Sequence, residues 1–149
     1  MLHIIPILRE IELFSSLQDE DLHLIAEICQ ERTYHKGDII SSQGELGNEV
    51  LIITQGYVEI LVDDRRDPLI KRIVANLGEG QIIGEMGLVD QGTRSATVRA
   101  IDEPTFVQVI EYKDLKQLCE NNTKIGYIIM KNLAADISFK LRHANILSG

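Results

Sequence analysis

The hydrophobic and polar positions along the chain follow two periods, and the changes between them divide the chain into three segments. Up to about Arg32, apolar residues recur at near-helical spacing, and acidic residues 19–21 stand where a first helical turn would begin. Negative charge is favourable at that end of a helix because of the helix dipole. The first segment is therefore predicted to be helical, on the spacing of Leu17, Leu22, Leu24, Ile25 and Ile28.

From about residue 34 to residue 112 the pattern changes to short apolar runs bounded by turn residues. Nine of the eleven glycines fall between Gly37 and Gly92, and Gly44, Gly47 and Gly56 are expected in turns that need positive φ. The runs predict strands at residues 50–53, 57–62, 70–75, 81–83, 97–100 and 105–110, with a charged hairpin tip at 63–68. Many short strands of this kind predict a mainly β domain, a jelly-roll-like β-barrel (double-stranded β-helix).

The last segment returns to helical spacing. Residues 114–120 suit a short helix, and the stretch 121–123 (Asn-Asn-Thr) can end it and cap the next one. From Lys124 onward, apolar residues repeat every four positions, which predicts a long amphipathic helix to about Leu147. We expect one domain over residues 1–149, with a helical N-terminal segment (residues 1–33), a β-roll (residues 34–112) and C-terminal helices (residues 113–149).

Composition and charge narrow the class of protein. A chain of 149 residues with 44% hydrophobic residues suits one globular domain. Its net charge of −8 argues against nucleic-acid binding, because neutralising phosphates needs a basic face. No apolar run approaches the roughly 20 residues of a membrane helix, and the N-terminus lacks a secretory signal. We therefore expect a cytoplasmic protein that neither binds nucleic acid directly nor enters a membrane.

The cysteines and histidines indicate no metal or redox chemistry. Cys29 and Cys119 are expected to be buried, reduced thiols of a reducing cytosol, with a structural disulfide as the alternative. The four histidines lack metal-ligand spacing, and no Cys-x-x-Cys pair occurs. No Ser-His-Asp or paired-carboxylate constellation is apparent in the sequence either, so we expect neither a metal site nor an enzyme.

Residues 84–97 carry the strongest chemical signal. Gly84 and Glu85 open a short apolar turn, and Arg94 stands in a run of small residues that leads into a strand. Glycine lets a backbone approach a ligand closely, with N–H groups facing it at the start of a helical turn. A guanidinium can meet two phosphate oxygens at once, and a carboxylate is a good acceptor for a sugar hydroxyl. A ligand with both a phosphate and a ribose would use both charges.

This segment resembles the phosphate-binding cassette of cyclic nucleotide-binding domains, whose usual form is Phe-Gly-Glu-Leu-Ala-Leu, a short loop, and Arg-Ala/Ser/Thr-Ala-Thr. The similarity continues outside the cassette. Residues 37–40, 44–48 and 51–56 are similar to the glycine-punctuated strands of the family, and residues 13–17 are similar to its first turn. The resemblance therefore covers nearly the whole chain.

The resemblance implies a sensor module that binds a cyclic mononucleotide, with no other cofactor. The implied ligand-binding residues are Gly84, Glu85, Met86, Arg94, Ser95 and Ala96. Arg94 would pair with the exocyclic phosphate oxygens, Glu85 would accept the 2′-hydroxyl, and backbone N–H groups of the others would face the phosphate. Ser95 matches the serine of bacterial activators that bind cyclic AMP, so cyclic AMP is expected over cyclic GMP.

Three cassette positions depart from the family pattern. Ile83 replaces the usual phenylalanine, which costs packing but no ligand contact. Thr93 replaces the proline that commonly precedes the arginine, so the loop is expected to be looser. Gly87 replaces an alanine, as it does in bacterial members that resemble the catabolite activator.

The base end of the site departs more. The resemblance implies that the C-terminal helix of this chain folds over the base and converts occupancy into a change of helix position. Where the activators carry a Thr-Ser pair on this helix, an ungapped alignment finds Lys140 and Leu141 here. Base recognition is therefore not transferred, and Ser138 and Asn145 are candidates for it.

The long helix also predicts an assembly. Its apolar stripe exceeds what one β-roll needs for cover, and apolar surface of that kind marks an interface. Apolar residues near its end have little chain left to hide under, namely Leu141, Ala144, Ile146 and Leu147. We expect a parallel, two-fold symmetric homodimer along this helix, as in the bacterial activators, with Lys140 interrupting the apolar series. Asp136 and Lys140 are expected to form a solvated pair.

Two further interpretations stay open. One is a structural dimerisation module of the same fold that binds no nucleotide, and the presence of both Glu85 and Arg94 counts against it. The other is the sensor portion of a larger transcription regulator whose DNA-binding domain is absent. The chain ends directly after the long helix, which fits either a stand-alone sensor or a portion of a longer regulator.

Overall fold

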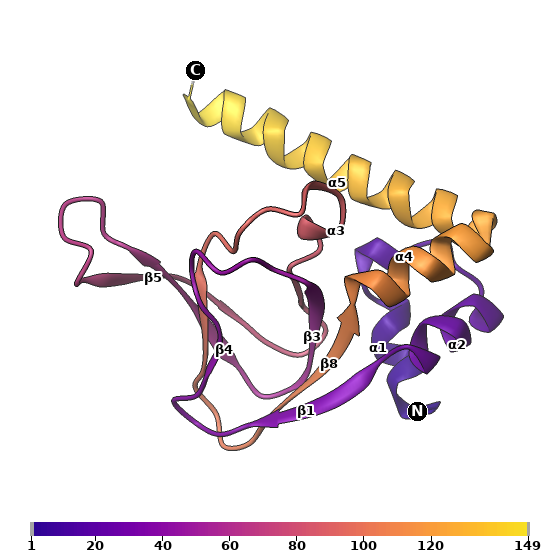
Figure 1. The fold of residues 1–149 in the computed structure, drawn as a ribbon, viewed down its shortest axis with the longest axis horizontal. Helices are drawn as coiled ribbons and strands as arrows, with labels where there is room; N and C mark the ends of the chain where they lie inside the picture. The colour runs from indigo at the N-terminus through magenta and orange to yellow at the C-terminus, as the bar shows by residue number, and fades with distance from the viewer. Residues whose placement is uncertain (1, 149) are drawn as a thin grey trace. The chain divides into compact units, whose positions relative to one another are not determined.

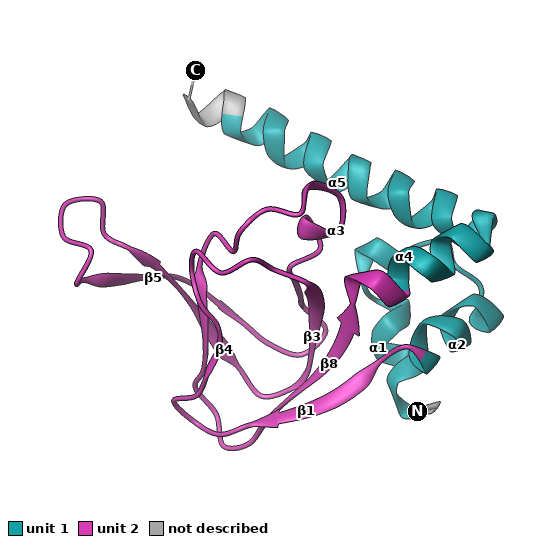
Figure 2. Cartoon of the chain, in the orientation of Figure 1, with its two compact units in different colours: residues 1–27, 115–149 teal, residues 28–114 magenta. Residues whose placement is uncertain are grey.

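The computed structural model describes the backbone of residues 2–148 and the side chains of residues 3–144. The chain divides into two compact units (Figure 2). The β unit, residues 28–114, is built mainly of strands. The helical unit, residues 1–27 with 115–149, is built of helices (Figure 1).

The strands of the β unit form two four-stranded antiparallel sheets. The first has the order β1-β8-β3-β6, with bounds Gln30–Tyr34, Thr105–Glu111, Glu49–Gln55 and Ile82–Ile83. The second has the order β2-β7-β4-β5, with bounds Ile39–Ser41, Thr97–Ala100, Val58–Asp63 and Lys71–Leu77. Apart from the β4–β5 hairpin, neighbouring strands come from distant segments of the chain, as in a jelly roll. The predicted mainly β, jelly-roll-like class is confirmed, with two sheets rather than one closed barrel.

The core of the β unit contains side chains from both sheets. Each fully buried aliphatic side chain contributes about 1.5–3 kcal/mol relative to exposure, so these residues hold the sheets together. The buried cluster consists of Leu51, Ile53, Val58, Val98, Val107 and Val109. Tyr34, Ile40, Ile60, Leu77 and Ile83 are partly buried and pack against it.

The predicted strands between residues 50 and 110 are present, and their ends differ by at most about two residues, the usual uncertainty of strand ends. The charged segment 63–68 is the tip between β4 and β5, as predicted. Asp64 Oδ1 accepts the backbone N–H of Arg66 at 2.7 Å, and Lys71 Nζ pairs with Asp63 Oδ1 at 2.9 Å. These are exposed contacts of a solvated hairpin.

The prediction of helix to about Arg32, and with it a helical segment that extends to residue 33, is wrong at its end. Helix α2 (Asp19–Glu27) stops at Glu27, and β1 follows. Every residue of β1 before Tyr34 is exposed, so the strand shows no alternation of apolar and polar residues. Its pairing with β8, in register from Gln30 opposite Val109, is what makes it a strand. A local pattern carries no signal of such an edge strand.

The helical unit begins with several short helices: η1 (Leu2–Ile4), α1 (Ile5–Arg9), η2 (Glu12–Phe14) and α2. The acidic first turn predicted for α2 is present at residues 19–21. Helix α5 (Thr123–Ser148) packs on this group, because Asn132 Nδ2 donates to the Leu13 and Ser15 carbonyl oxygens at 3.0 and 2.7 Å. Lys124 Nζ pairs with Asp21 Oδ2 at 3.1 Å.

The junction between the last two helices follows the prediction closely. Helix α4 (Tyr112–Asn121) ends at the expected break, and Asn122 Oδ1 accepts the Ile125 N–H at 3.1 Å as a cap. Gly126 lies against α4, where an added Cβ would stand 2.6 Å from the Cys119 carbonyl oxygen. The glycine therefore permits a close approach of the two helices.

Helix α5 has a covered half and an uncovered half. Ile125, Ile129 and Leu133 are buried, whereas every residue from 138 to 144 is exposed. Phe139 and Leu141 are each 60% exposed. The Lys140–Asp136 pair forms as predicted, at 2.9 Å. Among the residues that the structure describes, no helix is long and apolar enough to cross a membrane.

Both cysteines are reduced thiols, as expected, and no disulfide joins them. Cys29 is buried, and burial raises the pKa of its thiol to about 12. Cys119 is only half-buried, against the expectation of full burial, and the same cause raises its pKa. A thiol with a raised pKa stays protonated at neutral pH and is a poor nucleophile. Neither cysteine therefore has the character of a reactive site.

Candidate functional site

The cassette residues form a turn, a single helical turn and a loop between β6 and β7. Gly84 follows β6 with φ of +85°, a conformation that glycine adopts without steric cost. The chain then enters α3 (Gly87–Asp90), which ends at Gln91 in the left-handed conformation with φ 53°. Leu88 is buried and anchors this turn.

Arg94 is held by its backbone and by its side chain. Its N–H donates to the Glu45 carbonyl oxygen at 2.7 Å, and its own carbonyl accepts the Gly44 N–H at 2.8 Å. These bonds tie the Arg94 segment to the turn that follows β2. The side-chain Nη2 donates to the Glu49 carbonyl oxygen at 2.7 Å. The guanidinium is therefore fixed to the first residue of β3.

Two glycines make room for that guanidinium. A Cβ at Gly84 would overlap Arg94 Nη1 and would lie 2.9 Å from the Glu49 carbonyl oxygen. A Cβ at Gly47 would lie 3.0 Å from Arg94 Cζ and Nε. Gly44 and Gly56 have the predicted positive φ, at 89° and 88°, but Gly47 does not. The turn role predicted for Gly47 is therefore wrong, because what requires its lack of a side chain is Arg94.

Tyr112 joins the site from the end of β8, and sequence patterns gave no reason to include it. Its hydroxyl donates to the Gly84 carbonyl oxygen. A Cβ at Gly87 would overlap this hydroxyl, so a second glycine of the cassette is shaped around Tyr112. Burial raises the pKa of the phenol and the Arg94 guanidinium opposes that shift. The phenol therefore stays protonated and serves as a donor at neutral pH.

Of the six predicted ligand-binding residues, the structure places Gly84 and Arg94 in contact with each other. These two residues, ten positions apart, meet through the guanidinium. Glu85 and Ala96 are half-buried, and Met86 and Ser95 are exposed. A guanidinium carries five N–H donors in a planar fork, so the bond from Nη2 to Glu49 leaves donors that can meet an anion. A fixed positive charge beside glycines suits an anionic group that approaches the backbone closely.

The residues considered for the base lie on α5, in the helical unit. Ser138, Lys140 and Leu141 are exposed. Asn145 lies outside the residues whose side chains the structure describes, and so do Ile146 and Leu147 of the expected dimer helix.

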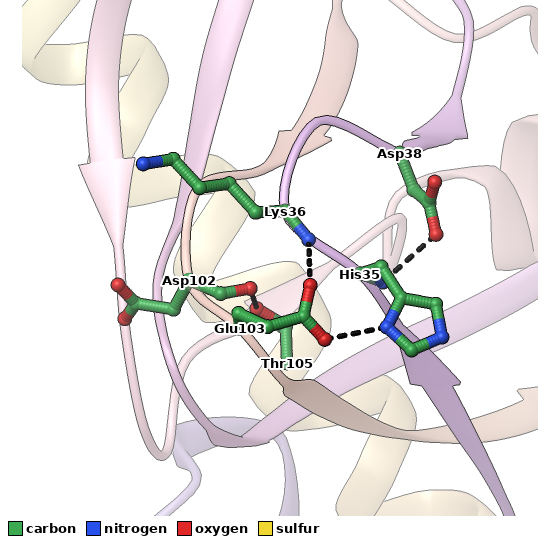
Figure 3. A network of polar contacts seen from close by, with 6 residues as sticks. All are labelled: His35, Lys36, Asp38, Asp102, Glu103 and Thr105. Atoms are coloured by element: carbon green, nitrogen blue, oxygen red, sulfur yellow. Dashed lines mark hydrogen bonds and ion pairs between the residues drawn. The ribbon is translucent and has the colours of Figure 1, made fainter.

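A second polar cluster joins two loops of the β unit (Figure 3). His35 Nδ1 lies 2.5 Å from Glu103 Oε1, and Glu103 Oε2 accepts the Lys36 N–H at 2.9 Å. The hydrogen bond to Glu103 raises the pKa of His35, which is exposed. Asp38 Oδ2 accepts the His35 N–H at 2.8 Å. This cluster connects the β1–β2 loop to the β7–β8 turn at the surface, and we interpret it as a structural contact between the two loops.

Metal binding finds no support in the described portion of the chain. No group of three or more His, Cys, Asp or Glu side chains there is arranged to hold an ion.

The jelly-roll fold and the cassette around Arg94 are those of a cyclic nucleotide-binding domain. Comparison with known proteins leads to the same class. The family described as cyclic nucleotide-binding domain matches residues 31–122. The chain is 30% identical over 134 residues to the cyclic AMP receptor protein of Thermus thermophilus, covering 90% of this chain and 59% of that protein. It is also 30% identical over 112 residues to a cGMP-dependent protein kinase of Eimeria tenella, covering 72% of this chain and 10% of the kinase.

Solved structures give the same result. The catabolite activator protein of Thermus thermophilus superimposes with a TM-score of 0.79 at 30% identity, over 91% of this chain and 60% of that one. The regulatory domain of Toxoplasma gondii PKA, in complex with cAMP, shares the fold with a TM-score of 0.76 at 20% identity, over 92% of this chain and 49% of that one.

The chain belongs to the cyclic nucleotide-binding domain family. It is a domain of the regulatory, ligand-sensing kind, as the resemblance implied. The chain spans from about a tenth to about three fifths of the length of the relatives that it matches here.

Proposed function

We propose that this domain senses cyclic AMP as a binding module without catalytic activity. The observation that carries the proposal is the position of Arg94, whose guanidinium is fixed by the Glu49 carbonyl and bordered by Gly47 and Gly84. A side chain held in this way is organised before the ligand arrives, so binding costs little ordering. The two exocyclic oxygens of a cyclic phosphate are a pair of acceptors that a planar guanidinium can bind at the same time.

The other cassette residues complete the proposed contacts. The backbone N–H groups of Gly84, Glu85 and Met86 and of Ser95 and Ala96 face the phosphate. The Glu85 carboxylate, which is half-buried in the structure, accepts the ribose 2′-hydroxyl. A cyclic phosphate and a ribose hydroxyl together explain why Arg94 and Glu85 lie in the same short segment.

The choice between cyclic AMP and cyclic GMP rests on Ser95. We propose cyclic AMP because Ser95 matches the serine of the cyclic AMP-binding bacterial activators. The relatives include both a cyclic AMP receptor protein and a cGMP-dependent protein kinase, so the two nucleotides need a direct comparison. Isothermal titration with each is expected to give micromolar or tighter binding, with cyclic AMP tighter. A tenfold preference for cyclic GMP would overturn the assignment.

Replacing Arg94 tests the site itself. Arg94→Ala is expected to cost about 2–5 kcal/mol in binding free energy, the loss typical of removing one partner of a desolvated charge pair. Arg94→Lys keeps the charge but cannot form the bidentate contact, so it should recover only some of the affinity. The control is Arg9→Ala, which removes an exposed arginine paired with Asp19 at 2.9 Å in the helical unit. Unchanged affinity in Arg94→Ala would show that the pocket lies elsewhere.

The same titrations test the alternative of a dimerisation module that binds no nucleotide. A ligand that binds the folded state raises the melting temperature, by an amount that grows with the logarithm of the ligand concentration relative to Kd. A cooperatively folded protein with no heat of binding and no thermal shift from either nucleotide would favour that alternative.

We further propose that α5 carries the output, as a lid over the base and as the seam of a homodimer. The support is that α5 belongs to a different compact unit from the cassette and that its second half is exposed from residue 138 to residue 144. Occupancy of the β unit would favour one position of α5 over another, which is a two-state signal. The same proposal covers a longer protein, in which a DNA-binding domain would read this signal.

A further inference from the structure

Ser41 carries a buried hydroxyl without a partner. It is the last residue of β2, and only 9% of the residue is exposed. Among the residues that the structure describes, Ser41 Oγ is one of two buried side-chain polar atoms with no hydrogen bond. Removing a hydroxyl from water without giving it a partner is unfavourable, so such an atom needs an explanation.

The register of the sheet places this hydroxyl on the inner side of the roll. Ser41 lies opposite Val98 of β7, and Val98 lies opposite Ile60 of β4. Residues opposite each other in antiparallel strands point to the same face. Val98 belongs to the buried cluster that contains side chains of both sheets, and Ile60 packs against it. Ser41 therefore faces an apolar interior.

An irregularity in β2 is what turns Ser41 inward. Ile39 lies opposite Arg99 and is 49% exposed, and the register shifts between Ile39 and Ser41. In a regular strand, residues two positions apart share a face, so Ser41 would have followed Ile39 outward. The bulge thus places a polar residue where the fold would otherwise have an apolar one.

The same ladder leads directly to the arginine segment. Beyond Ser41, the Gln43 N–H donates to Thr97 Oγ1 at 3.0 Å, and the Gly44 N–H donates to the Arg94 carbonyl oxygen at 2.8 Å. The chain before β7 and the chain after β2 therefore run together from Ser41 to Arg94. Ser41 lies at the end of the second sheet nearest to the proposed phosphate site.

From this geometry we infer that the Ser41 hydroxyl hydrogen-bonds the edge of the purine base of the bound cyclic nucleotide. The inference rests on the proposed function, in which Arg94 takes the phosphate and Glu85 the ribose, so the base is what is left to recognise. An apolar surround suits the faces of a flat heterocycle, and a single hydroxyl in it suits one polar atom on the edge. A hydroxyl both donates and accepts, so it can meet adenine or guanine and orients the base rather than selecting it.

Ser41→Ala tests the inference with two readouts, the affinity for cyclic AMP and the melting temperature of the nucleotide-free protein. Titration with cyclic AMP is expected to show an affinity about three- to tenfold weaker, the effect of losing one neutral hydrogen bond. The nucleotide-free protein should melt at the same or a higher temperature, because the variant removes a hydroxyl that lacks a partner. Ser42→Ala is the matched control, since Ser42 is the next residue and is only partly buried; its affinity should not change.

The result separates this inference from the proposed function. If wild-type protein binds neither cyclic AMP nor cyclic GMP, the proposed function fails. If wild type binds but Ser41→Ala binds equally well, only the role of Ser41 fails. A variant that loses affinity and melts lower than wild type would show that Ser41 acts through packing, which also overturns the inference.

Base analogues identify the bonded atom. Wild type and Ser41→Ala are titrated with cyclic AMP analogues that each lack one polar group of the base: the 6-amino group, N1, N3 or N7. One analogue is expected to bind both proteins with the same affinity, because the bond that the serine makes is already missing from it. A constant ratio between the two proteins across all four analogues would exclude a hydrogen bond from Ser41 to the base.

Discussion

At the scale of single residues, the site is a charge held in place by uncharged neighbours. The Arg94 guanidinium donates to the Glu49 carbonyl oxygen and lies against Gly47, Gly84 and the Tyr112 hydroxyl. A carboxylate partner would neutralise the charge that an anionic ligand needs. A carbonyl oxygen fixes the direction of the side chain and leaves that charge available.

Gly84 and Gly80 form a matched pair that separates backbone strain from contact with Arg94. Their φ angles are +85° and +84°, so alanine at either position has a similar conformational cost, about 1 kcal/mol or somewhat more. A Cβ at Gly80 would meet nothing within 4 Å, whereas a Cβ at Gly84 would overlap the guanidinium. Gly84→Ala is expected to abolish measurable binding, and Gly80→Ala to lower stability by that amount and keep affinity. Equal affinities in titration would contradict the described position of Arg94.

Tyr112→Phe removes one hydroxyl from the site. The variant loses the hydrogen bond to the Gly84 carbonyl oxygen, which helps to hold the cassette turn beside Arg94. Binding of the cyclic nucleotide is expected to weaken by about 0.5–1.5 kcal/mol, the net value of a neutral hydrogen bond. Titration measures the change, with Tyr57→Phe as the control because Tyr57 is 56% exposed in the same unit. A loss in both variants would show that the effect is not specific to the Tyr112 contact.

At the scale of helices and strands, packing against a neighbouring element explains two features that local propensity does not: the strand β1 and the glycine within α5. Strand β1 consists of exposed polar residues and exists because β8 pairs with it. Gly126 is a poor residue for a helix, yet α5 contains it where the Cys119 carbonyl oxygen comes closest. In both places a neighbouring element overrides the intrinsic preference of the segment.

Gly126→Ala compares the gain in helix propensity with the cost of overpacking against α4. Helix propensity alone predicts that alanine would stabilise the protein by about 1 kcal/mol. The added Cβ would lie 2.6 Å from a backbone carbonyl oxygen, and overpacking of this kind costs about 1–3 kcal/mol or more. We therefore expect net destabilisation in denaturant unfolding. Ala134→Gly, at an exposed position of the same helix, measures the propensity term by itself; a stabilised Gly126→Ala would mean that the two helices can separate at little cost.

At the scale of the whole molecule, the exposed half of α5 predicts association. The helix has 26 residues, about 39 Å at 1.5 Å per residue, and its exposed half presents Phe139 and Leu141. We expect a two-fold dimer along α5, with a mass of about twice the 16.8 kDa of the chain in light scattering.

Charged substitutions identify the dimer surface. Phe139→Glu and Leu141→Glu should both shift the protein to the monomer, and Phe139→Glu should do so while nucleotide binding remains. The control is Leu69→Glu, because Leu69 is 93% exposed but lies in the β unit, at the tip between β4 and β5. A mass near 16.8 kDa for wild type at high concentration, with and without nucleotide, would refute the dimer.

Features that depend on neighbours along the chain could be predicted from local sequence patterns. The six strands between residues 49 and 111, the break at residues 121–123 and the long last helix follow from local period and turn residues, and the structure has all of them. Strands β1 and β2 were not predicted in this way. The family assignment followed from the spacing of Gly84, Glu85 and Arg94. These signals are local because periodicity, capping and a short ligand-binding loop involve residues within one or two turns of each other.

Contacts between residues far apart in the chain depend on strand pairing in three dimensions and could not be predicted from local patterns. Tyr112 reaches Gly84 because β3 pairs with both β8 and β6, and Gly47 borders Arg94 because the turn after β2 bonds to the segment before β7. The inward position of Ser41 depends on a bulge seen only in its pairing with β7. Such contacts arise from register between strands far apart in sequence, and a one-residue change of register reverses the face of every side chain. The pattern of apolar and polar residues along the chain does not specify this register.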